Sequence, residues 1–69
     1  MALSDNIRKR RIQLGMTQGQ LAKRLNVSEM AISKFENDLA KPQPKLFVML
    51  ADALGTTCKE LVEGDEADG

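Results

Sequence analysis

The sequence contains no histidine, tryptophan or tyrosine, and it has a single cysteine, two phenylalanines and two prolines. One cysteine cannot form an internal disulfide, and without histidine the chain offers neither a zinc site nor a supported catalytic nucleophile. It also lacks an apolar run long enough for a signal peptide or a membrane span. We therefore expect a cytoplasmic protein that is not an enzyme, with no metal, no cofactor, no membrane contact and no small-molecule ligand.

The charged residues are also unevenly distributed along the chain. The net charge over all 69 residues is zero, but residues 1–45 carry nine lysines and arginines against four acids, and residues 46–69 carry one lysine against six acids. The two parts therefore carry +5 and −5. A chain with such a charge dipole can orient on a polyanion despite its neutral total.

The pattern of apolar residues, capping residues and glycines predicts one all-α domain without strands. The expected helices are Asp5–Leu14, Gln18–Leu25, Glu29–Glu36, Lys45–Leu54 and Cys58–Glu63. Ser4 is the expected N-cap of the first helix, and Pro44 suits the first turn of the fourth. Residues 65–69 are acidic and contain no apolar side chain larger than alanine. They predict a flexible acidic tail after a folded domain at residues 1–64.

The segment from Thr17 to Asn37 is the most informative part of the chain. Thr17 and Gln20 have the spacing of a capping box, and Asn26 suits the left-handed backbone that ends many helices. Ser28 then caps the next helix at once. So short a turn forces the two helices to cross steeply, which is typical of a helix-turn-helix that presents its second helix to the major groove of DNA.

Two charged residues lie on apolar helix stripes, Arg11 in the first helix and Glu36 in the third. A buried, unpaired charge costs several kcal/mol, so we predict that the two side chains form an ion pair with each other. The alternative is that both long side chains reach solvent.

The run Arg11–Gln18, followed by Leu21-Ala22, Val27-Ser28, Ile32-Ser33 and Phe35–Asn37, resembles the Cro/CI-type (XRE) helix-turn-helix family. This family includes the Cro proteins and the repressor N-terminal domains of lambda-like phages. The resemblance covers about residues 3–63 and implies a compact five-helix, lambda-repressor-like domain that binds operator DNA as a two-fold dimer. The chain departs from the family pattern at Asn26, which replaces the usual turn glycine, and at Gly19 inside the second helix.

Base contacts are expected from Gln18, which matches the family pattern, and from the exposed side of the third helix. The base-reading candidates are Gln18, Ser28, Glu29, Met30, Ser33 and Lys34. Glu29 can accept from cytosine N4, Lys34 can donate to guanine, and Met30 can contact a thymine methyl. Two alternatives stay open: Glu29 equally stabilises the helix dipole, and Met30 equally fills a gap against a neighbouring helix.

Contacts to DNA phosphates and to a second subunit are expected elsewhere. The phosphate-contacting candidates are Arg10, Thr17, Gln18, Asn37 and Lys41. A monomer of this size reads only a few base pairs, so a homodimer on DNA is expected. The candidates for its interface are Leu39, Pro44, Thr57, Cys58 and Leu61.

We therefore predict a phage or prokaryotic transcription regulator, a small Cro-like or repressor-type protein that binds specific double-stranded DNA. The alternative is an antitoxin or adaptor that uses the same fold to bind a protein, which the neutral net charge and Glu29 on the reading face favour weakly.

Overall fold

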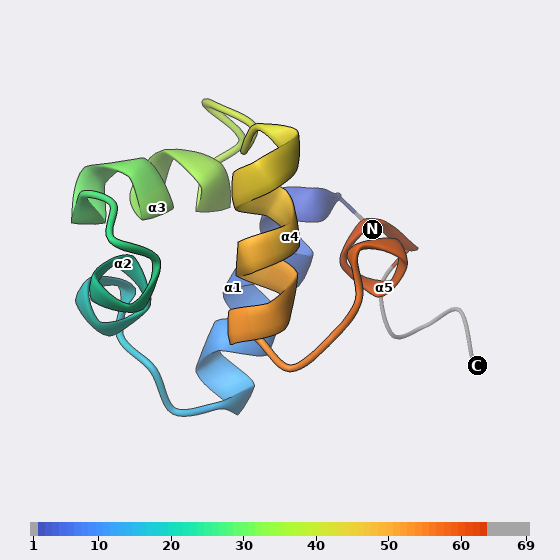
Figure 1. The fold of residues 1–69 in the computed structure, drawn as a ribbon, viewed down its shortest axis with the longest axis horizontal. Helices are drawn as coiled ribbons and strands as arrows, with labels where there is room; N and C mark the ends of the chain where they lie inside the picture. Colours follow the sequence, from blue (N-terminus) through green and yellow to red (C-terminus); the bar gives the residue numbers. More distant parts are fainter. Residues whose placement is uncertain (1, 64–69) are drawn as a thin grey trace.

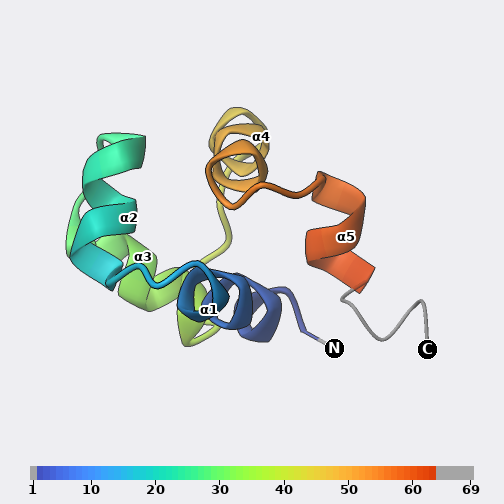
Figure 2. The ribbon, with the colours of Figure 1, turned by 90° about the horizontal axis from the view of Figure 1, so that it is seen from below.

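The computed structural model describes residues 2–63, and within this range it contains five α-helices and no strand (Figures 1 and 2). The helices are α1 (Leu3–Gln13), α2 (Gln18–Leu25), α3 (Glu29–Glu36), α4 (Pro44–Ala53) and α5 (Cys58–Glu63). The predicted all-α class is confirmed, whereas the predicted tail at 65–69 lies outside the described residues.

The helices surround a single core. Figures 1 and 2 show α1 and α4 in the middle, with α2 and α3 on one side of them and α5 on the other. Helix α1 packs against α3 and α5, and α4 packs against α2 and α5. The buried apolar residues are Ile7, Leu21, Ala22, Leu25, Ile32, Phe35, Leu50, Ala51, Leu54 and Leu61. Every helix therefore contributes to the same core.

Helix α1 differs most from its prediction. It begins at Leu3 with Ala2 as its N-cap, so Ser4 is not the cap but a buried residue of the first turn. Asn6 is buried as well, and its side-chain amide donates to the carbonyl of Leu61 in α5 over 2.6 Å. Packing of this polar side against α5 extends the helix beyond the point where capping preferences alone would start it.

The other helix ends follow local backbone chemistry. Helices α2, α3 and α5 have the predicted bounds, and α4 begins at Pro44, one residue before the predicted start. Gly15 and Gly55, with φ of +70° and +66°, supply the left-handed backbone after α1 and α4. Asp38 adopts the same conformation, with φ of +59°, which the sequence did not predict.

Candidate functional site

The corner between α2 and α3 is built by short-range hydrogen bonds. The Thr17 hydroxyl accepts the N–H of Gln20 at 3.0 Å, and the Gln20 side chain accepts the N–H of Thr17 at 2.8 Å. At the other end of α2, Asn26 has φ of +59° and ψ of +43°, so it takes the left-handed position of the missing glycine. Ser28 then accepts the N–H of Ala31 at 3.1 Å. The predicted capping box, turn and cap are confirmed.

Helix α3 has one anchored side and one exposed side. Ile32, Phe35 and Glu36 are buried, so they fix the helix to the body of the domain. Met30 is 67% exposed, and Glu29 and Lys34 are also exposed. The Met30 side chain therefore does not fill a gap against a neighbouring helix, which removes one of the two interpretations of this residue.

Glu36 is the centre of a buried ionic cluster. Its carboxylate accepts two hydrogen bonds from Arg11, at 2.6 Å from Nε and 3.1 Å from Nη2. The Glu36 side chain has no solvent exposure, whereas that of Arg11 retains 12%. Arg8, which the sequence analysis did not single out, places its Nε 3.6 Å from the same carboxylate. Its position three residues before Arg11, about one helical turn, is the signal that could have identified it.

Gln18 completes this cluster at the start of α2. Its side-chain amide donates to Oε1 of Glu36 at 3.1 Å. Burial by itself would raise the pKa of the Glu36 carboxyl, but hydrogen bonds from Arg11 and Gln18 and the charges of Arg11 and Arg8 hold this pKa below its ordinary value. One carboxylate therefore ties side chains of α1 and α2 to the last turn of α3.

The structure gives a local reason for a glycine at position 19, which the sequence did not reveal. A Cβ atom at this position would lie 3.3 Å from Oε1 of Glu29, the first residue of α3. The glycine leaves room for the Glu29 side chain beside the first turn of α2, so the N-terminal ends of the two helices lie close together.

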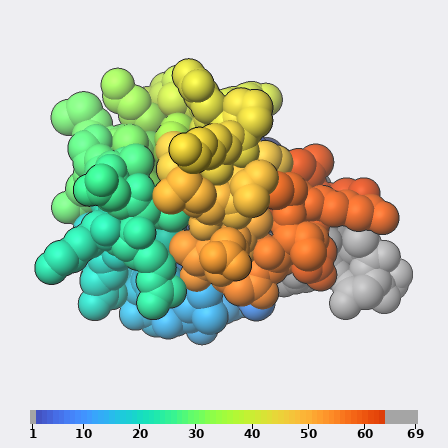
Figure 3. All heavy atoms as spheres, viewed as in Figure 1, coloured from blue at the N-terminus to red at the C-terminus, as the bar shows by residue number. Residues whose placement is uncertain are grey.

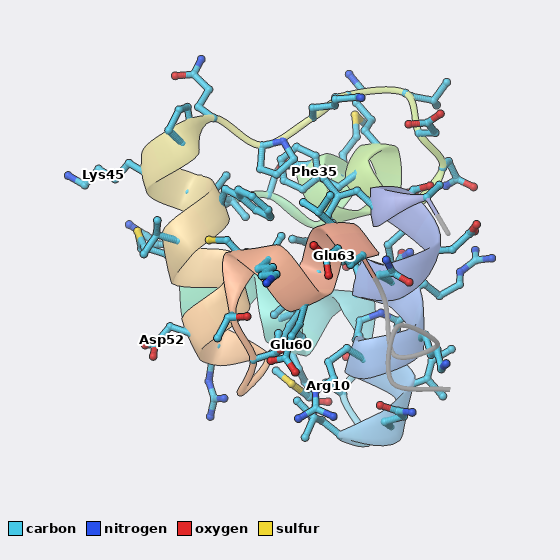
Figure 4. The ribbon with its side chains drawn as sticks, turned by 90° about the vertical axis from the view of Figure 1, so that its right-hand side faces the viewer. Arg10, Phe35, Lys45, Asp52, Glu60 and Glu63 are labelled. Carbon is cyan, nitrogen blue, oxygen red and sulfur yellow. The ribbon has the colours of Figure 1, made fainter. Side chains whose placement is uncertain are left out.

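The expected phosphate contact of Arg10 needs correction. Its Nε donates to the carbonyl of Leu54 at 2.8 Å, and its Nη2 donates to that of Gly55 at 3.2 Å. Nη1 also donates to Gln13 at 3.3 Å. Figure 4 shows Arg10 near Glu60, at the opposite end of that view from Phe35 of α3. Arg10 therefore satisfies the carbonyl end of α4 and is not placed with the exposed side of α3.

The other phosphate candidates lie around α2 and α3. Thr17, Asn37 and Lys41 are exposed, and Gln18 is half-buried. The Asn37 amide turns back and donates to the carbonyl of Ser33 at 2.7 Å, so it caps the end of α3.

The candidates for a subunit interface differ in their exposure to solvent. Leu39 is 74% exposed, and Pro44 and Thr57 are exposed as well. Cys58 is partly buried against the core, and Leu61 is only 2% exposed. Leu61 is therefore a core residue of the monomer and was wrongly assigned to the interface, because the inner side of α5 faces α1 and α4.

Two negative findings apply to residues 2–63. No group of three or more metal-ligating side chains gathers in this range. No helix there is both long enough and apolar enough to span a membrane.

Comparison with known proteins agrees with this architecture. A family model described as helix-turn-helix matches residues 7–61. The P22 c2 repressor, solved in complex with the synthetic operator 9T in the presence of Tl+, is 32% identical, with 94% of this chain and 98% of that chain covered and a TM-score of 0.89. The solution structure of the DNA-binding domain of the P22 c2 repressor is also 32% identical, with 94% and 86% covered and a TM-score of 0.90.

A more distant match shows the fold alone. Hydroxypropylphosphonic acid epoxidase from S. wedmorenis is 23% identical, with 87% of this chain but only 32% of that chain covered and a TM-score of 0.81.

Proposed function

The chain belongs to the helix-turn-helix family, and from this premise we propose that it is a transcription regulator that binds specific double-stranded DNA. In this proposal α3 enters the major groove and α2 crosses the phosphate backbone beside it. The P22 c2 repressor, to which the chain is similar over 94% of its length, was solved with a synthetic operator, which supports a repressor-type role.

The observation that carries the proposal is the division of α3 into two sides. Its inner side chains are fixed by the core and by the buried carboxylate of Glu36, while Met30 stands 67% exposed at the first turn. A large apolar side chain exposed at the N-terminal end of such a helix is suited to contact a thymine methyl. Glu29 and Lys34 are exposed as well, and they offer an acceptor for cytosine N4 and a donor for guanine.

Backbone positioning is proposed for the start of α2 and the loop after α3. Gln18 uses its amide nitrogen for the bond to Glu36, so its amide oxygen is proposed to accept a bond from elsewhere. Thr17, before α2, and Lys41, in the loop after α3, are exposed. Such contacts fix register without reading sequence. Ser28 and Ser33 are proposed as short polar contacts to a base or a phosphate.

A two-fold dimer on the operator is the second part of the proposal. Two copies of α3 must reach half-sites about 34 Å apart, one turn of DNA, to read a site of useful length. Leu39 and Pro44 are the strongest of the interface candidates, because both are exposed and lie close in sequence, Leu39 after α3 and Pro44 at the start of α4.

Selection of binding sites from a library of random duplex DNA tests both parts. We expect an enriched, two-fold symmetric sequence whose half-sites are separated by one helical turn, and an affinity that falls steeply with salt. Enrichment of an asymmetric short site would contradict the two-fold dimer but not the binding of specific DNA. Equal affinity for selected and random DNA would contradict base reading, and retention of a protein partner without DNA would favour the adaptor.

A further inference from the structure

Helix α4 has a second, outward side that the core does not use. Its inward residues include Leu50 and Ala51, which are buried, whereas Val48 is 60% exposed and Met49 is 42% exposed. Lys45 and Asp52 are exposed as well. The exposed four follow the spacing i, i+3, i+4, i+7, which places them on one face of a helix. We call Lys45, Val48, Met49 and Asp52 the outer stripe.

The charges at the two ends of the outer stripe do not stabilise α4 itself. Lys45 lies in the first turn of α4 and Asp52 in the last, so each charge has the sign that the helix dipole disfavours. Figure 4 shows both side chains pointing away from the domain on the same side of α4. No ion pair with either charge is found among residues 2–63. Both charges are therefore available to a group outside the chain.

We infer that the outer stripe binds the same stripe of a second copy of this chain, with the two α4 helices antiparallel. The stripe is symmetric about the point midway between Val48 and Met49. A two-fold axis at that point therefore brings Lys45 against Asp52 of the second copy, and Asp52 against its Lys45. The same operation brings Val48 against Met49 of the second copy, twice. An interface of this kind is isologous, so each favourable contact occurs two times.

The surface beside the stripe offers room for the second copy. Met49 and Leu25 line two adjoining hollows between α2 and α4, with volumes of about 270 and 400 Å³. Figure 3 shows α4 at the surface between α2 and α5, so an approaching helix is not blocked by the described elements on this face. Neither the exposed residues of α3 nor Leu39 and Pro44 are part of the stripe, so this contact is separate from base reading and from the interface proposed for the dimer on DNA.

Charge reversal provides the test, with association measured by sedimentation equilibrium at low salt and without DNA. Because the interface is small, we expect the wild type to dimerise weakly, with a Kd of up to about 1 mM. Lys45→Glu places a new carboxylate against Asp52 twice, and Asp52→Lys places two lysines together twice. Each variant should weaken association by about tenfold or more. The double variant and an equimolar mixture of the two single variants should both recover it, because each restores opposite charges at both ends.

Matched controls lie on α5. Lys59→Glu and Glu63→Lys change exposed charges in the same way but lie outside the stripe, so they should leave association within about twofold of the wild type. Val48→Glu, which puts a charge at the centre, should abolish association while circular dichroism shows a folded helix bundle. A wild type that stays monomeric at millimolar concentration overturns the inference. Single reversals that associate like the wild type, or a mixture that fails to recover, overturn it too.

Discussion

Among single residues, Glu36 has the largest structural consequence. Its carboxylate is fully buried, accepts from Arg11 and Gln18, and lies 3.6 Å from Nε of Arg8. A buried carboxylate is tolerated when it is paired with this many donors. Removing a partner lowers the stability of the fold, because an uncompensated charge stays buried. Glu36 therefore helps to hold α3 in place, although its own side chain is buried.

Replacing Arg11 by alanine should lower the free energy of unfolding by about 3–5 kcal/mol, because it leaves Glu36 buried without its bidentate partner. Urea denaturation followed by circular dichroism measures the loss. The double change of Arg11 to methionine and Glu36 to leucine is the control, and it should cost clearly less. An unchanged denaturation midpoint for Arg11→Ala would show that the pair contributes nothing.

At the scale of elements, α2 and α3 are specified mainly by residues at their ends. Thr17 and Gln20 start α2, Asn26 ends it, and Ser28 starts α3, each through a hydrogen bond or backbone preference within four residues. Local chemistry therefore specifies the turn, and the Gln18–Glu36 bond and the buried side of α3 add to it by holding the two helices against each other.

Asn26→Val should destabilise the domain by about 1–2 kcal/mol, because a β-branched residue resists the left-handed backbone that Asn26 adopts. Asn26→Gly should stay within about 0.5 kcal/mol of the wild type, since glycine accepts that conformation freely. Thermal and urea unfolding of both variants measure the difference. Equal stability of the two variants would mean that the turn backbone rearranges without cost.

The exposed side of α3 is best tested by comparing two lysines. Lys34→Ala should relax the preference at one base pair by about 1–3 kcal/mol, because it removes a proposed base-edge donor. Lys41→Ala should instead weaken binding to all sequences alike and reduce the salt slope by about one. Titration of selected and mismatched duplexes at several salt concentrations separates the two effects. A uniform loss for Lys34→Ala would assign it to phosphate.

For the whole molecule, the polar side of α1 connects the other elements. Asn6 donates to α5, Arg10 donates to the carbonyls at the end of α4, and Arg11 reaches Glu36 in α3. Arg11 also donates to the carbonyl of Met16 before α2, at 2.7 Å. Helix α1 thus contributes little apolar burial beyond Ile7, and it holds the domain together through side chains that bond to distant parts of the chain.

Unfolding of the whole domain should respond to acid through Glu36. Its pKa is lowered in the folded state, so its stabilising effect is present above the ordinary value of 4.5 and is lost as the pH falls through the folded value. We expect the free energy of unfolding to fall more steeply below about pH 4.5 in the wild type than in Glu36→Gln. Urea unfolding between neutral and acid pH tests this, and parallel curves would contradict it.

The sequence alone determined the all-α class, the bounds of α2, α3 and α5, and the caps and turn of the helix-turn-helix. These features depend on backbone preferences and hydrogen bonds within one helical turn, which neighbouring residue types specify directly. It also predicted the Arg11–Glu36 contact, because a charge on each apolar stripe requires a partner. The base-reading residues stay predictions, since an exposed side chain acquires its role only against DNA.

The tertiary structure decided the partners of Asn6, Arg10 and Gln18 and the burial of Ser4 and Leu61. The bond from Arg10 to Leu54 joins residues 44 positions apart, and that from Asn6 to Leu61 joins residues 55 apart. No local pattern encodes such a pairing, because the same arginine on a helix surface is equally compatible with solvent, a phosphate or a distant carbonyl. Packing of α1 against α5 and the position of the residues that end α4 choose among them. The same fold leaves the outer stripe of α4 exposed.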